Sequence, residues 1–151
     1  MQRIIVSDTS CLILLHKIGR ISLLKSLFGK IVITSTIASE FGQVVPDFVD
    51  IEDPADKIYQ QILEQYLDRG EASAIALALE KDDSLLIMDE AKGRREARQL
   101  KLNVTGTIGI LIVAKERGLI ESFTDVINQI SQTDFRISES LILEAKRRCG
   151  E

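Results

Sequence analysis

The sequence predicts an α/β protein in which helices cover both faces of a central parallel sheet. Its strand-like segments are short, continuous apolar runs, such as residues 4–6 and 85–88. Continuous runs are typical of strands buried on both faces of a sheet. Helical segments alternate with these strands, which favours parallel pairing. The 151 residues show no repeat or linker, so we expect one domain over residues 1–151.

The order of the elements follows from apolar spacing and from the residues that interrupt it. The expected strands cover residues 1–7, 31–33 and 84–88, with a short one around Val104. The expected helices cover residues 11–17, 21–28, 57–68, 71–81, 92–101, 107–117, 123–130 and 138–148, and a further helix begins within residues 34–36 and ends at about Phe41. Residues 45–56 contain both prolines, and we interpret them as a solvated loop or an edge strand.

Composition and charge exclude several classes of protein. No apolar run approaches the ~18 residues of a membrane span, and no leader pattern opens the chain, so we expect a cytoplasmic protein with no membrane partner. The only cysteines, Cys11 and Cys149, are interpreted as reduced thiols. The net charge of −4 does not indicate a nucleic-acid binder, so such a role must rest on a local basic patch.

Two acidic residues directly follow predicted strands. Asp8 comes after the first strand, and Asp89 follows residues 85–88. Ligands of open parallel sheets bind outside the carboxyl ends of the strands. If the two strands are neighbours, these carboxylates lie close together at one edge of the sheet.

Two further acids, Glu40 and Glu71, lie on helices expected to pack against the sheet. Glu71 near a helix N-terminus is also explained as an ordinary first-turn residue, and Glu40 as a solvated one. Carboxylates gathered in one cleft either take up protons or bind a cation, and oxygen ligands favour Mg²⁺ or Mn²⁺. Histidine chemistry is hard to build, because the only histidine, His16, lies on an apolar helix.

These residues stand in segments that resemble the PIN-domain proteins, metal-dependent ribonucleases that include many prokaryotic toxins of toxin–antitoxin pairs. A PIN subfamily known mainly as predicted nucleic-acid-binding proteins is the nearer resemblance. The matching segments are residues 4–10, 36–41, 70–78 and 85–90, then Gly93-Arg94 and residues 104–109. Two departures concern acids: Glu71 stands where Asp is common, and Asp89-Glu90 where the subfamily often has two Asp.

The resemblance implies a three-layer α/β/α fold with Mg²⁺ or Mn²⁺ in an acidic pocket, and hydrolysis of RNA phosphodiesters by metal-activated water. The implied catalytic and metal-holding residues are Asp8, Glu40, Glu71 and Asp89. Thr9 or Ser10 resembles the family's small hydroxyl residue beside the first acid, and Glu90 and Thr107 are expected near the site. The resemblance also implies a homodimer and a small antitoxin partner.

The expected RNA-binding residues lie on the helix after Asp89. They are Lys92, Arg94, Arg95, Arg98 and Lys101. Arg94, Arg98 and Lys101 fall at helical spacing on one face, although a solvated helix face also explains them. A second basic group, residues 146–148, is interpreted as complementing the dipole of the last helix.

Two other functions remain open. The same fold could serve as a nucleic-acid- or protein-binding module that does not cleave. A phosphoryl-transfer or receiver protein built on Asp8 is a third candidate. Ser10 argues against it, because many phosphotransferases carry a second Asp at that position.

Overall fold

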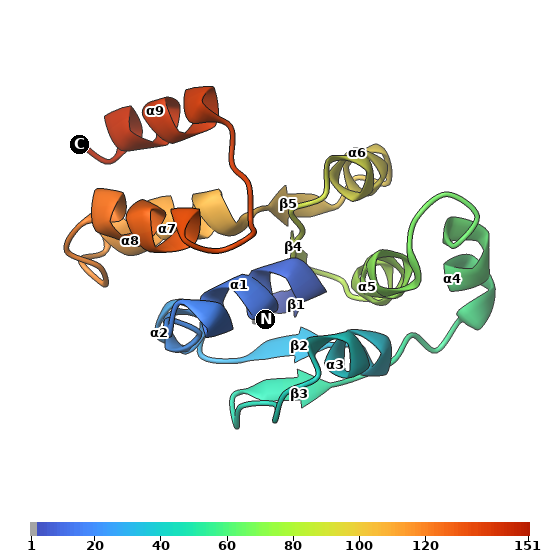
Figure 1. The fold of residues 1–151 in the computed structure, drawn as a ribbon. Coiled ribbons are helices and arrows are strands. Elements are labelled where there is room, and N and C mark those ends of the chain that lie inside the picture. Colours follow the sequence, from blue (N-terminus) through green and yellow to red (C-terminus); the bar gives the residue numbers. More distant parts are fainter. Residues whose placement is uncertain (1–2) are drawn as a thin grey trace.

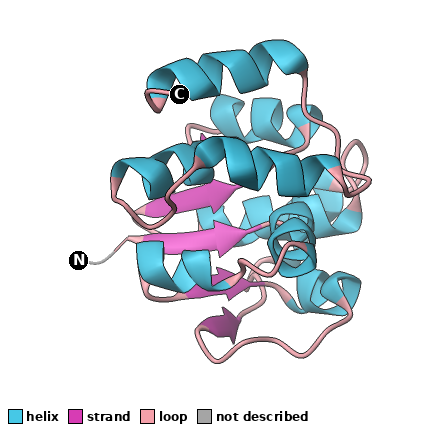
Figure 2. Cartoon of the chain, turned by 60° about the vertical axis from the view of Figure 1, so that its left-hand side comes forward, coloured by secondary structure: helices cyan, strands magenta, loops and turns pink. Residues whose placement is uncertain are grey.

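The computed structural model describes residues 3–151, and it contains one five-stranded sheet in the order β3-β2-β1-β4-β5 with every pair parallel. Helices lie in front of and behind the strands (Figures 1 and 2). The predicted three-layer α/β/α fold with a central parallel sheet is therefore confirmed. The strands are β1 (Ile4–Ser7), β2 (Ile31–Ile33), β3 (Val49–Ile51), β4 (Ser84–Ile87) and β5 (Asn103–Thr105).

Most helices fall within two or three residues of their predicted bounds. They are α1 (Thr9–Lys17), α2 (Ser22–Phe28), α3 (Ser35–Phe41), α4 (Lys57–Leu63), α5 (Arg69–Leu79), α6 (Ala91–Gln99), α7 (Thr107–Glu116), α8 (Phe123–Ser131) and α9 (Glu139–Arg148). The interpretation of residues 45–56 as a loop or edge strand is confirmed, because β3 is the edge strand beside β2. The start of the first predicted strand, at residues 1–2, lies outside the described residues.

The register of the sheet brings the ends of β1 and β4 side by side. Ile4 pairs with Ser84 and Ser7 with Ile87, so the two strands end at the same level. The chain order along the sheet reverses between β1 and β4. In open parallel sheets, this switch point is where ligands bind.

One predicted helix is wrong in length. The expected helix over residues 57–68 ends at Leu63, and a turn separates α4 from α5. Asp68 is the reason, since its side chain accepts from the Glu71 backbone and starts a new helix. The predicted apolar face is also only partly buried: within α4, Leu63 is buried, while Ile58 is 68% exposed.

The last three helices form a second apolar cluster beyond the sheet core. Leu111, Phe123 and Ile127 of α7 and α8 are buried in it. The C-terminal helix α9 (red in Figure 1) joins through Ile142 and Ala145. This packing places α9 beside α7 and at a distance from the edge strand β3.

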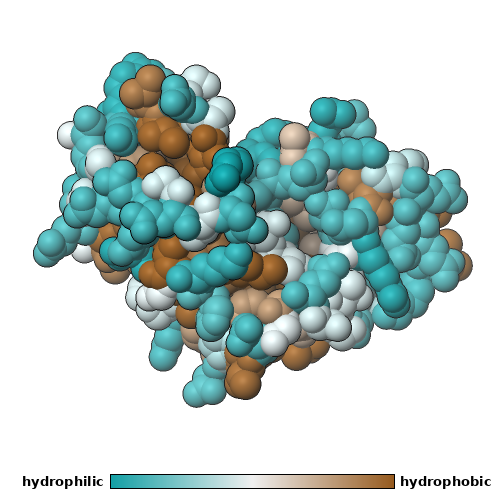
Figure 3. Space-filling model, in the orientation of Figure 1, coloured by the Kyte–Doolittle hydropathy of each residue, from teal (hydrophilic) through white to brown (hydrophobic). Residues whose placement is uncertain are grey.

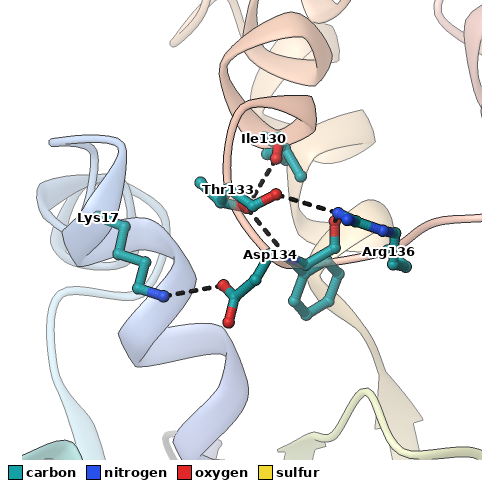
Figure 4. A network of polar contacts seen from close by, with 6 residues as sticks. Lys17, Ile130, Thr133, Asp134 and Arg136 are labelled. Atoms are coloured by element: carbon teal, nitrogen blue, oxygen red, sulfur yellow. Dashed lines mark hydrogen bonds and ion pairs between the residues drawn. The ribbon is translucent and has the colours of Figure 1, made fainter.

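Polar contacts at both ends of α9 fix its position. Before it, Lys17 of α1 donates to Asp134 over 2.9 Å, and Thr133 organises the same turn (Figure 4). After it, the Glu151 carboxylate accepts from the backbone N–H groups of Phe123 and Thr124 at the start of α8. The Thr124 hydroxyl also donates to this carboxylate, and together with the two backbone bonds it lowers the pKa of Glu151 to about 2. Across residues 3–151, no helix has both the length and the apolarity needed to cross a membrane.

Candidate active site

Asp8 lies at the end of β1 and starts α1. One carboxylate oxygen accepts from the Cys11 N–H over 3.0 Å, which makes Asp8 the N-cap of α1. The other accepts from the Asp89 N–H over 2.8 Å. The side chain is almost fully buried, with 4% of Asp8 exposed. A strand end, a helix start and a neighbouring strand therefore fix the orientation of this carboxylate.

Asp89 follows β4, and the residues after β5 orient it. Thr107 donates to it twice, from the backbone N–H over 2.8 Å and from the hydroxyl over 2.6 Å. Gly106 lies so close that a Cβ there would stand 2.9 Å from the Asp89 carboxylate and 2.6 Å from the Arg94 guanidinium. Any larger residue at this position would force one of these two side chains to shift, so the 104–109 motif contributes to the shape of the site.

The two glutamates come from helices; Glu40 is exposed, whereas Glu71, like Asp89, is partly buried. Glu40, on α3, accepts from the Thr9 hydroxyl over 2.5 Å and lies against Gly70 at the start of α5. Glu71 is half-buried in the first turn of α5, where it forms a reciprocal capping box with Asp68. The hydrogen bonds of Glu71 are therefore those of an ordinary residue in the first turn of a helix, as the simpler interpretation predicted.

Mutual repulsion and burial raise the pKa values of two of these acids. Burial, followed by the Asp89 charge, raises the pKa of Asp8 to about 7, with a smaller contribution from Glu71. Burial and the charges of Asp68, Glu90 and Glu40 raise the pKa of Glu71 to about 7. The acids form one electrostatically connected group, and such a group is stabilised either by protons or by a cation.

The donor set suits a hard divalent cation, because carboxylate oxygens are the ligands that Mg²⁺ and Mn²⁺ favour. Each oxygen of Asp8 and Asp89 accepts one hydrogen bond, which leaves a second lone pair for an ion. Within residues 3–151, however, no three His, Cys, Asp or Glu side chains converge as a metal-binding group. An ion would therefore bind first at the aspartate pair, and the glutamates would have to approach it.

The residues expected beside the acids take different positions. Thr9 contacts Glu40, and Thr107 contacts Asp89, as described above. Glu90 caps α6, where it accepts from the Lys92 N–H over 3.2 Å. Ser10 is exposed and faces away, lining a small cavity that also includes Asp134. Of this group, Thr9 and Thr107 are the two that bond to the predicted metal-holding acids.

A groove of about 890 Å³ begins at Asp89 and runs between α6 and α9. Three of the five predicted RNA-binding residues line it: Arg94, Arg95 and Arg98. Lys92 and Lys101 are not part of its lining. The expected alignment of Lys101 with Arg94 and Arg98 is wrong, because α6 ends before it and Lys101 adopts a left-handed backbone with φ of 67°.

Arg94 connects the groove to the acids. Its guanidinium donates to the Met88 carbonyl over 3.1 Å. Burial and the neighbouring Arg98 lower its pKa, while Asp89 and Asp8 act in the opposite direction. Arg148 also lines the groove. From the sequence alone, residues 146–148 were assigned only to the dipole of the last helix and to no site. Sequence reasoning missed this role because Arg94 and Arg148 are far apart in the sequence and meet only in the folded chain.

Comparison with known proteins identifies the family. The model of one family, described as a PIN domain, matches residues 4–151. No curated protein matches the chain. No solved structure matches it either. The matched segment includes the sheet, the acidic residues at its switch point and the groove. The chain therefore belongs to the PIN-domain family, whose members are generally nucleases.

Proposed function

We propose that this protein is a Mg²⁺- or Mn²⁺-dependent endoribonuclease that hydrolyses RNA phosphodiester bonds. One observation carries the proposal: Asp8, which is buried, and Asp89, which is partly buried, lie hydrogen-bonded together at the sheet's switch point, where an arginine-lined groove begins. Carboxylates that could hold a cation therefore lie next to guanidinium groups that could bind phosphates. A phosphodiester substrate needs both, and family membership agrees with this chemistry.

The proposed role of each residue follows from the contacts that orient its side chain. Asp8 and Asp89 would hold the cation, since backbone N–H groups already orient both carboxylates. Glu40 and Glu71 would complete its surroundings directly or through water. When bound, the cation polarises a phosphoryl oxygen and lowers the pKa of a bound water. Arg94, beside Asp89, would bind the phosphate, because a guanidinium pairs with phosphate oxygens bidentately.

The finer biological role rests on the family resemblance. We propose a cytoplasmic toxin of a toxin–antitoxin pair, active as a homodimer and neutralised by a small antitoxin protein. The test is the gene's neighbourhood, where a small adjacent reading frame of the DNA-binding type would support the toxin role. Its absence from the gene's neighbourhood contradicts the toxin assignment and leaves the nuclease assignment intact.

The test of the nuclease compares two Asp→Asn variants at opposite edges of the sheet, one after β1 and one before β4. Asp8→Asn, at the carboxyl end of β1, removes one of the paired charges; Asp82→Asn makes the same change before the start of β4, away from the site. With Mn²⁺, we expect the wild type and Asp82→Asn to cleave single-stranded RNA and Asp8→Asn to be inactive while folded. Equal cleavage by Asp8→Asn contradicts the proposal.

A second function is favoured by one observation. Because no three acids converge within residues 3–151, the chain could be a PIN-fold module that binds nucleic acid or protein without cleaving. Saturable RNA binding without turnover, over varied RNAs and with Mn²⁺ present, supports this alternative. Metal-dependent turnover that Asp8→Asn abolishes rules it out.

A further inference from the structure

The groove beside the acids has two walls that come from distant parts of the chain. Helix α6 supplies Arg94, Arg95 and Arg98, and α9 supplies Leu141 and Arg148. Figure 3, in the orientation of Figure 1, shows the surface hollowed between the part over α9 and the part over α6. The floor is apolar and includes Val104, Ile108 and Ile112 of β5 and α7.

The orientation of α9 is fixed by its packed side. Ile142 and Ala145 contact the second apolar cluster, and Glu151 bonds to the start of α8. Leu141 and Arg148 lie about two turns apart on another face of the helix, and that face lines the groove. The packing that holds α9 in place therefore also directs Arg148 toward α6.

Neighbouring arginines on α9 have different surroundings. Arg147 donates to both oxygens of Glu144, over 2.7 and 2.5 Å, and this ion pair raises its pKa. Arg148 forms no ion pair with another residue in the range 3–151. A helix dipole alone would treat the two alike. The difference indicates that Arg148 is available to an external anion.

The positive charge of the groove favours an anion with several phosphates. Four arginines line it, against one acid, Asp89 at its end. The protein as a whole has a net charge of −4, so this positive lining is local. Guanidinium groups on two walls can bind successive phosphates of one backbone, and the position of Asp89 connects that backbone to the cleavage site.

We propose that α9 is the second phosphate-binding wall of the groove and that Arg148 contacts the RNA backbone from the side opposite α6. This assignment rests on the proposed nuclease function. It makes Arg148 a substrate-binding residue that no part of the acidic site requires. The RNA strand then lies between Arg148 and Arg95 or Arg98, with its cleaved phosphate near Asp89.

The experiment uses adjacent substitutions on one helix. Binding of a labelled single-stranded RNA is measured by fluorescence anisotropy in chelator, over a range of salt, for Arg148→Gln and the matched control Arg147→Gln. Loss of a charge-assisted contact predicts about a 10-fold rise in Kd for Arg148→Gln. Loss of one phosphate contact also predicts a salt slope lower by about one. Arg147→Gln should match the wild type, and Arg148→Lys should restore most of the salt slope because it keeps the charge.

A cleavage assay with Mn²⁺ separates this inference from the proposed function. Arg148→Gln should raise KM with kcat nearly unchanged, the pattern expected when binding away from the reacting atoms is lost. If Arg148→Gln behaves as Arg147→Gln while Asp8→Asn is inactive, the nuclease assignment stands and the α9 wall is wrong. If the wild type neither binds nor cleaves RNA but binds an acidic peptide through Arg148, both proposals are wrong.

Discussion

The strand-borne acids and the helix-borne acids of the site are held in different ways. Asp8 and Asp89 accept bonds from backbone N–H groups, which move only with the sheet and the helix starts beside it. Glu40 depends on the hydroxyl of Thr9, and Glu71 on a 3.4 Å contact in its own capping box. The aspartates are thus preorganised, whereas the glutamates can adjust when an ion binds.

The largest expected effect is on the rate of cleavage, and it distinguishes the aspartate pair from the glutamate pair. Asp89→Asn removes a preorganised ligand, so we expect cleavage with Mn²⁺ to fall by at least about 100-fold. Glu40→Gln should cost about 10-fold, because an adjustable residue or water can replace its contribution. Both rates are measured under single-turnover conditions, with Asp82→Asn as the control. Equal losses in the two variants contradict the distinction between the pairs.

A smaller effect tests whether Thr107 is what makes Asp89 rigid. Thr107→Val keeps the backbone N–H but removes the buried hydroxyl that donates to Asp89. We expect a loss of about 10-fold in activity or metal affinity, the usual effect of removing a partner that orients a ligand. Thr107→Ser keeps the hydroxyl and should retain most of the activity. Losses of equal size in both variants would point to packing instead of the hydrogen bond.

The smallest effect is on stability and needs no substrate. The pKa of Asp8 is raised from 3.8 to about 7, and that of Glu71 from 4.5 to about 7. The folded state then keeps protons that the unfolded state releases. The contribution of these two acids to stability is therefore full below about pH 4 and is lost as the pH rises to about 7. In chelator, the unfolding midpoint should fall across this range. Asp8→Asn should reduce the fall more than Glu71→Gln, since Asp8 is the more buried of the two.

Manganese provides the control for that pH series. An ion bound to the folded state at 100 times its Kd adds about 2.7 kcal/mol, which is about 5–10 °C in the midpoint for a chain of this size. The added stability should be greatest above pH 7, where both acids are ionised. A midpoint that neither pH nor Mn²⁺ moves would show that the acids do not form a coupled group.

Local signals were enough to predict the strand-borne half of the site. Asp8 and Asp89 could be placed because a buried strand is readable from its apolar run, and because parallel strands end at one edge. The two carboxylates lie close together because β1 pairs with β4. From the sequence alone, this pairing could be stated only as a condition and could not be predicted. The N-cap role of Asp8 was not predicted, because the helix was expected to begin at Cys11 and it begins at Thr9.

Features that depend on tertiary packing could not be predicted. The apolar spacing over residues 57–68 indicated one helix, but Asp68 caps α5, and the chain turns after Leu63. Lys101 has helical spacing from Arg98 but lies beyond the end of α6. Arg148 joins the groove only because α9 packs on α7 and α8, and no short-range pattern contains that information.

The uneven distribution of charge has a consequence for how a substrate arrives. The net charge of −4 would disfavour the approach of the proposed RNA substrate, while the four arginines of the groove would attract it. Such a field would orient an approaching strand before contact, within the Debye length of about 10 Å at moderate salt. For the proposed RNA substrate, the acidic composition that argued against nucleic-acid binding would then disfavour encounters away from the groove and favour those that lead to Asp89.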